Sequence, residues 1–218
     1  MPRLGASRIW ASLGGSAVLQ MFVNDDARLR AARGFDPVAL ARLESAAWIG
    51  YYRREWFRVL AASAGLVRCG FALSWPKTLR GAWLVLRANQ AWAPYPDNDP
   101  DRARRLMAKF YVLTGGAGAH FDAREAARLE VEWWRIHRAL QHGDADDTTE
   151  LGDAVAALYA YTYDRSIGDV RDSGELRAEA MRICDDWVAA GCDLRDARVV
   201  DMRRSLLRSY RSLKAAVA

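Results

Sequence analysis

One stretch of this chain occurs twice, and its apolar periodicity is that of a helix. Residues 41–52 align with residues 127–138 without a gap. The main corresponding pairs are Ala41 and Ala127, Arg42 and Arg128, Leu43 and Leu129, Glu44 and Glu130, Trp48 and Trp134, and Tyr51 and His137. At about 100° per residue, each stretch has one apolar half and one largely polar half. The sequence therefore predicts two similar amphipathic helices.

A glutamate lies inside the apolar half of both predicted helices. Glu130 and His137 fall within about 20° of each other on the helical wheel, and Glu44 is surrounded by apolar residues in the same way. A carboxylate in such a place costs several kcal/mol unless it is paired, hydrogen-bonded or protonated. Two helices with this feature at matching positions indicate a polar site in the core.

Signals for helix starts are spread along the chain. Asp36, Asp99 and Asp122 are typical N-caps, and a proline follows the first two. Ser173 with Gly174 predicts a further helix start. We find no run of alternating β-branched residues bounded by hairpin turns. The sequence is therefore that of an all-α protein.

The predicted domain organisation is simple. Residues 35–218 are expected to form a single bundle of six to eight helices. In that bundle the two similar helices, at about 36–62 and 122–141, face a common core. Residues 1–34 are expected to be an N-terminal segment that is loosely ordered or docked on the bundle.

Composition excludes several classes of protein. A hydrophobic fraction of 51% and nine tryptophans exclude a disordered chain and supply material for an aromatic-lined cavity. Cys69, Cys184 and Cys192 form no CxxC pair, so neither a disulfide framework nor a zinc ribbon is indicated and a cytoplasmic location is expected. No apolar run is long enough for a transmembrane span. Nucleic-acid binding is not expected, because no helix-turn-helix or aromatic-basic platform is recognisable.

The basic character of the chain is concentrated in residues 195–214. This predicted helix has seven arginines or lysines and two aspartates, and its net charge of +5 equals that of the whole chain. Such a helix suits docking on the bundle with a solvated arginine face. It also suits a partner-binding surface, which would make the chain a non-enzymatic interaction protein. The arginines of that surface would be Arg203, Arg204, Arg208 and Arg211.

The paired glutamates predict an aromatic-walled pocket between the two similar helices. Two buried carboxylates at close range can act as an acid and a base. We therefore expect Glu130 and His137 to be the acid–base or ligand-binding pair, oriented by Glu44 and Tyr51. The predicted function is that of a small-molecule enzyme or binding protein that acts on a small, largely apolar substrate by acid–base chemistry. No cofactor is predicted, and the oligomeric state is left open.

Other side chains are expected to line this pocket. Trp48 and Trp134 would form its walls. A third helix would turn Asn89 and Gln90 inward, on the same side as Leu79 and Trp83. Buried amides need hydrogen-bond partners, and a ligand can be one of them.

A structural network is an alternative use of the same glutamates. In this interpretation Glu130 pairs with Arg54, Arg58 or Arg87 only to fix the register of the helices. Such a network perturbs pKa values as an active site does.

A metal site is the other alternative. The pattern Glu130-x6-His137 resembles one ligand motif of the haem-oxygenase-like di-iron proteins. The resemblance implies a transition-metal oxidase in which Glu44 and Asp185 are further ligands. The chain departs from that family because it has three histidines and no further D/E-x-x-x-H motif. Glu130 and His137 are also about 10 Å apart along a helix, so both reach one metal only with extended side chains.

Several segments together resemble an uncharacterised family of all-helical bacterial proteins with no assigned activity. They are the two Leu-Glu-x3-Trp segments described above, Ala180-Met181, Asp186-Trp187-Val188 and the segment Ser209-Tyr210-Arg211-Ser212-Leu213. The resemblance covers about residues 36–217. It implies a single helical domain and transfers no catalytic residues.

Overall fold

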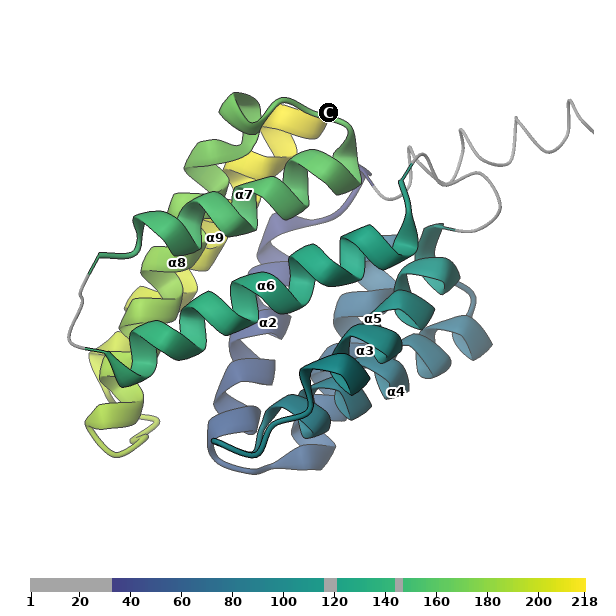
Figure 1. Ribbon diagram of the computed structural model, residues 1–218. Coiled ribbons are helices and arrows are strands. Elements are labelled where there is room, and N and C mark those ends of the chain that lie inside the picture. Colours follow the sequence, from purple (N-terminus) through teal and green to yellow (C-terminus); the bar gives the residue numbers. More distant parts are fainter. Residues whose placement is uncertain (1–32, 116–120, 144–146) are drawn as a thin grey trace, which may run out of the picture.

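The computed structural model describes residues 33–115, 121–143 and 147–218, and every regular element in these ranges is an α-helix (Figure 1). The helices are α2 (Pro37–Tyr52), α3 (Trp56–Phe71), α4 (Trp75–Trp92), α5 (Pro100–Gly115), α6 (Ala123–His142), α7 (Thr149–Tyr163), α8 (Ile167–Ala189) and α9 (Ala197–Val217). The predicted all-α fold is confirmed. The prediction for residues 1–34 lies almost wholly outside the described residues. Across the described ranges, no helix combines the length and apolar character needed to cross a membrane.

The helices close a ring around a central cavity. Each helix from α2 to α9 packs against the next one in the sequence, and α9 packs against α2. In Figure 1 the long helix α6 crosses in front, with α7, α8 and α9 on one side of it and α3, α4 and α5 on the other. A four-helix bundle fills its own centre with side chains, whereas a larger ring of helices leaves space inside. Here the space is a cavity of about 480 Å³, and all eight described helices contribute to its lining.

Local sequence explains where several helices begin. The Asp36 side chain accepts a hydrogen bond from Val38 N, and the Asp122 side chain accepts from two backbone N–H groups of the first turn of α6. The predicted helix start at Ser173 is wrong, because α8 begins earlier, after Ser166. Ser166 and Asp169 form a capping box there.

Small residues in α8 have a packing role instead. A Cβ atom on Gly174 would lie 2.4 Å from the carbonyl oxygen of Gly152, so the backbones of α7 and α8 approach too closely for a larger residue. Ser173 Oγ donates to Ser209 O, and Ser209 Oγ donates to Ser173 O, which joins α8 to α9 in the same region. These contacts hold the three helices on one side of the ring together.

The helix predicted over residues 36–62 is two helices in the structure. The chain leaves α2 at Arg53 and turns at Arg54, whose φ of 60° is left-handed. Arg53 Nε and Arg58 Nη1 both donate to the Glu55 carboxylate and so fix the turn. The turn has no glycine or proline, and therefore the usual sequence signal for a break is missing.

The prediction for α4 is also partly wrong. Leu79 and Trp83 were expected to face the core, but they are 58% and 53% exposed. The buried side of α4 combines small residues with larger ones: Thr78, Gly81, Ala82, Leu84, Leu86, Ala88 and Trp92. A Cβ atom on Gly81 would meet Val67 at 3.1 Å, so α4 packs closely on α3 through this side.

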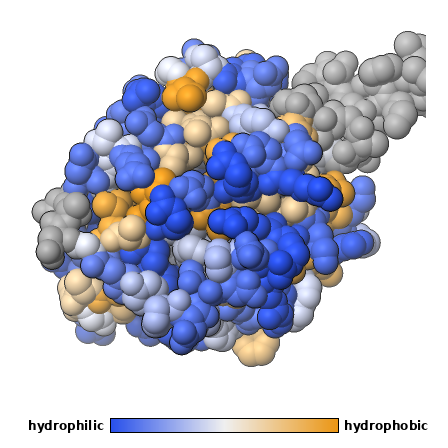
Figure 2. Space-filling view, in the orientation of Figure 1, coloured by the Kyte–Doolittle hydropathy of each residue, from blue (hydrophilic) through white to orange (hydrophobic). Residues whose placement is uncertain are grey.

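The basic helix α9 docks on the bundle by its apolar stripe. The buried residues of that stripe include Val199, Met202, Leu206, Leu213 and Val217. Hydrophilic side chains likewise cover the outward face of α6 (Figure 2). They include the i,i+3 ion pairs Arg128–Glu125 and Arg135–Glu132.

Candidate functional site

The central cavity is mainly apolar, with charged and hydroxyl groups at a few places. Apolar lining residues include Leu40, Val67, Phe71, Val85, Trp92, Met107, Phe110, Leu158, Met181 and Leu213. Polar lining residues include Glu44, Tyr111, Glu130, His137, Tyr159, Arg177 and Tyr210. A cavity with a mainly apolar wall and a few polar groups is typical of small-molecule sites.

Glu44 forms a buried ion pair with Arg177 of α8. Arg177 Nη2 donates to Glu44 Oε1, and the two side chains are only 12% and 6% exposed. Tyr210 of α9 donates to Glu44 Oε2 at 2.6 Å, so both carboxylate oxygens are satisfied. Arg177 Nη1 donates to Tyr159 of α7 at 2.7 Å. This Glu44 cluster links α2, α7, α8 and α9.

Burial and the Glu44 charge shift the pKa values of the residues around Glu44. Burial by itself lowers the pKa of Arg177, but the Glu44 charge outweighs it and holds that pKa well above its usual value. Burial raises the pKa of Tyr159 to about 12, and it raises the pKa of Tyr210 well above the ordinary value, where the Glu44 charge adds to the effect. Both phenols therefore remain protonated near neutral pH.

Glu130 is held by neutral donors. Tyr111 of α5 donates to Glu130 Oε2 at 2.7 Å, and Trp134 Nε1 donates to Glu130 Oε1 at 3.2 Å. Burial raises the pKa of Glu130, against the opposing effects of the Arg177 charge and of the two hydrogen bonds. Burial and the nearby Glu130 charge raise the pKa of Tyr111 well above its usual value. Compared with an exposed glutamate, Glu130 is thus shifted towards its protonated form.

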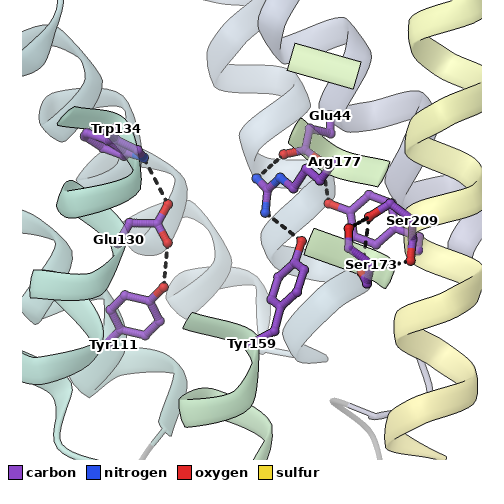
Figure 3. A network of polar contacts seen from close by, with 9 residues as sticks. Glu44, Tyr111, Glu130, Trp134, Tyr159, Ser173, Arg177 and Ser209 are labelled. Atoms are coloured by element: carbon purple, nitrogen blue, oxygen red, sulfur yellow. Dashed lines mark hydrogen bonds and ion pairs between the residues drawn. The ribbon is translucent and has the colours of Figure 1, made fainter. Parts of the chain in front are cut away.

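The two glutamates are held by separate groups of side chains. Helix α2 packs on α3 and α9, whereas α6 packs on α5 and α7. Figure 3 shows Glu130 with Tyr111 and Trp134 as one group, and Arg177 with Glu44 and Tyr159 as another. The two helices thus have different main packing partners, although Glu44 and Glu130 line the same cavity.

His137 belongs to a third group, at another part of the cavity wall. Its Nε2 is 2.8 Å from Asp185 Oδ2, and Gln141 Nε2 donates to Asp185 Oδ1 at 2.7 Å. Gln141 Nε2 also donates to the Tyr52 hydroxyl at 2.6 Å. Burial, with the Asp185 charge, raises the pKa values of Tyr52 and Cys184, so the thiol is not a ready nucleophile. The Asp185 carboxylate orients the imidazole and leaves Nδ1 for other partners.

Two buried donors on the cavity wall have no hydrogen-bond partner in the described part of the chain. They are Trp133 Nε1 and Arg177 Nε. The Arg177 guanidinium lies over the Trp133 ring, with Cζ 5.1 Å from the ring centroid, so the two side chains are neighbours. Buried donors rarely lack acceptors, and each such group calls for an explanation. Both residues line the cavity, where an acceptor on a bound molecule could reach them.

The remaining predicted lining residues lie as follows. Trp48, Trp134, Tyr51 and Asn89 line the cavity, whereas Gln90 is not part of its lining. Gln90 Oε1 instead accepts a hydrogen bond from Arg87, and Asn89 Nδ2 donates to its own helix at Val85 O.

The alternative metal ligands are not gathered at one point. His137 and Asp185 are in contact, but Glu44 and Glu130 belong to the two other groups. In the residues that the structure describes, no three His, Cys, Asp or Glu side chains are placed to hold a metal ion together. The four residues do not fit a di-metal site, in which the carboxylates must share the ions.

Sequence reasoning missed the central cation. The predicted partners of Glu130 were Arg54, Arg58 and Arg87, but Arg58 donates to Glu55 and Arg87 donates to Gln90. Arg177 was not considered. Its signal is present, since it lies in α8 one turn from the buried residues Ser173, Gly174 and Met181.

Comparison with known proteins does not assign the chain to a family. No model of a known protein family, no curated protein and no solved structure matches the chain. This agrees with a resemblance to a family that has no assigned activity. The function must therefore be argued from the cavity itself.

Proposed function

We propose that the chain binds a small, mainly apolar molecule in the central cavity and that Glu130 and His137 form its acid–base pair. The observation that carries the proposal is the cavity of about 480 Å³, with its apolar wall and its two buried donors that lack partners. Its volume lies within the usual range of ligand sites, roughly 300–1,000 Å³.

The charges around the cavity favour a neutral polar group on that molecule. Glu44 already balances the charge of Arg177, and the raised pKa of Glu130 reflects how unfavourable a further buried anion is. A ligand carboxylate would bring one more negative charge into this environment. A carbonyl or ether oxygen would instead accept from Trp133 Nε1 and Arg177 Nε without adding charge.

The same geometry supports acid–base chemistry. Burial raises the pKa of Glu130, so its carboxyl keeps a proton to higher pH than an exposed glutamate does, which suits the proton-donor role that we propose for it. His137, oriented by Asp185, is the proposed base. Glu44 and Tyr51 have positioning roles in this proposal. The two reactive groups are about two helical turns apart, so a bound molecule would lie between them along α6.

Ligands that share one alkyl chain test the binding proposal. Dodecane, dodecan-2-one and dodecanoic acid differ only at one end, and their binding can be compared by native mass spectrometry and by the shift in thermal unfolding. We expect the ketone to bind more tightly than the other two. Its preference over the alkane should be roughly five- to tenfold, because one net hydrogen bond stabilises by about 1 kcal/mol. Absence of binding for all three compounds would contradict the proposal.

A matched pair of tryptophan variants locates the polar end of the ligand. Trp133→Phe keeps an aromatic ring but removes the unpartnered N–H, so the ketone should lose its advantage over the alkane. Trp134→Phe is the control, because the N–H of Trp134 already donates to Glu130. This variant should change both affinities alike. Native mass spectrometry of the protein as purified, beside its denatured mass, would also identify any molecule that it retains.

A further inference from the structure

The surface formed by α3 and α4 has an unusual charge. Residues 56–96 contain no Asp or Glu, although the chain has 27 acidic residues in total. The cations in this range are Arg58, Arg68, Lys77, Arg80 and Arg87. A region without acids and with several cations is attracted to an anionic surface.

An apolar stripe runs along the exposed side of α4 in the same region. Trp75, Leu79 and Trp83 follow one another at steps of four residues and are 60%, 58% and 53% exposed. At about 100° per residue they form one narrow stripe along the helix. Large exposed side chains in a continuous row are informative, unlike a single exposed leucine.

Arginines accompany both tryptophans. Arg68 Cζ lies 4.9 Å from the ring centroid of Trp75, and Arg87 Cζ lies 5.8 Å from that of Trp83. Tryptophan beside arginine or lysine is the combination that favours the headgroup region of a bilayer, since the ring is amphipathic and the cation meets lipid phosphates. We call Trp75, Leu79 and Trp83, with Arg80 and Arg87 beside them, the α4 face.

The cavity reaches the surface next to the α4 face. Among the described residues, three exposed side chains line the cavity: Ala72, Ser74 and Lys77. They come from the turn between α3 and α4 and from the first turn of α4. Trp75 lies within the same short segment. A molecule that enters the cavity here therefore passes beside the tryptophan stripe.

We propose that the α4 face docks on an anionic lipid bilayer surface. The tryptophans would enter the headgroup region while Arg80 and Arg87 meet acidic lipids, and the mouth of the cavity would then lie beside the bilayer surface. Docking itself follows from the charge and the stripe. Its use as a route for an apolar ligand into the cavity rests on the proposed function.

Vesicle flotation of the full chain, without any cavity ligand, tests the docking proposal. We expect binding to vesicles of phosphatidylcholine with phosphatidylglycerol, and much weaker binding to phosphatidylcholine alone. Replacing Trp75 and Trp83 together by Ser should reduce the partition coefficient by roughly tenfold or more. Replacing Arg80 and Arg87 by Gln should reduce it by roughly fivefold for each cation, on the acidic vesicles only. Circular dichroism would verify that these surface variants fold.

The control removes equal charge from the other basic surface of the chain. Arg204→Gln with Arg211→Gln lies on α9, which packs against α8 and α2, and it should leave flotation unchanged. Loss of flotation in this control but not in the α4 variants would overturn the proposal. So would a wild-type chain that does not float, or one whose Trp75/Trp83 variant only abolishes self-association. Because no cavity ligand is present, failure here leaves the binding of dodecan-2-one as a separate test of the cavity.

Discussion

Glu44 and Glu130 occupy matching positions in two similar sequences, yet their surroundings differ in one decisive respect. Glu44 has a cation, Arg177, and a tyrosine donor. Glu130 has a tyrosine and a tryptophan as donors. The first is a compensated charge, whereas the second is a carboxyl whose burial raises its pKa. Similar local sequences thus give one structural glutamate and one candidate proton donor.

The difference between the two sites comes from residues that other helices supply, and not from the two similar stretches. Arg177 is supplied by α8 and Tyr111 by α5, and neither lies in the part of the sequence that repeats. A helix sequence decides that a glutamate faces inward, while the neighbouring helices decide its charge. Variants of these neighbours should therefore separate the two sites.

The largest effect is expected for Arg177→Met. Removing the cation leaves Glu44 buried without a counter-charge, which should cost about 3–5 kcal/mol of unfolding free energy in urea denaturation. The control is Arg182→Gln on the same helix, where the ion pair with Asp186 is exposed and the cost should be about 0–1 kcal/mol. Equal losses in the two variants would show that the Glu44 cluster is not an effective ion pair.

A pair of tyrosine variants should give a smaller, graded difference. Tyr210→Phe removes a donor to the ionised Glu44 and should cost about 1.5–3 kcal/mol, as expected for a hydrogen bond to a charged group. Tyr111→Phe removes a donor to a carboxyl whose pKa is raised by burial and should cost about 0.5–1.5 kcal/mol. Urea denaturation near neutral pH measures both. The reverse order would contradict the assigned protonation states.

The smallest effect, and the most specific, concerns Glu130→Gln. Because burial raises the pKa of Glu130 in the folded state, the folded state binds the proton more tightly than the unfolded chain does. This stabilisation is complete below the unfolded pKa of about 4.5 and is lost as pH rises through the folded value. The Gln variant resembles the protonated form, so it should unfold at a higher temperature than wild type near neutral pH. The advantage should disappear towards pH 4.

Glu132→Gln is the matched control for this pH profile. Glu132 lies on the outward side of the same helix, and its hydrogen bonds with Arg135 lower the pKa of its carboxyl. The stabilisation from Glu132 is therefore present above its unfolded pKa and lost as pH falls. Its variant should be slightly less stable than wild type near neutral pH, opposite in sign to Glu130→Gln.

Much of the fold follows from the sequence because its signals are local. The caps at Asp36 and Asp122 and the apolar arcs of α2 and α6 are read from neighbouring residues, and the all-α prediction is confirmed. The break after Tyr52 was missed because side-chain bonds to Glu55, rather than a glycine, hold the turn. The orientation of α4 was missed because small residues such as Gly81, Ala82 and Ala88 lie on its core side while the large side chains of Leu79 and Trp83 are exposed.

The candidate site could be predicted only in part. Periodicity identified Glu44, Glu130 and His137 as inward-facing, and the structure places all three on one cavity. The hydrogen-bond partners of these three residues depend on how α5, α7, α8 and α9 are arranged around α2 and α6. No sequence motif specifies the closed ring that sets this arrangement. The role of these residues in binding or catalysis remains a proposal for the variants above to test.

Closure of the ring also orders events during synthesis. Glu44 obtains Arg177 and Tyr210 from positions 133 and 166 residues later in the chain. A ribosome that has made both similar stretches has therefore not yet made the cation that one of them needs. Until α8 and α9 emerge, Glu44 stays in water, where an ionised carboxylate has no desolvation cost. Contacts between such distant residues form slowly, so the charged interior is expected to assemble late in folding.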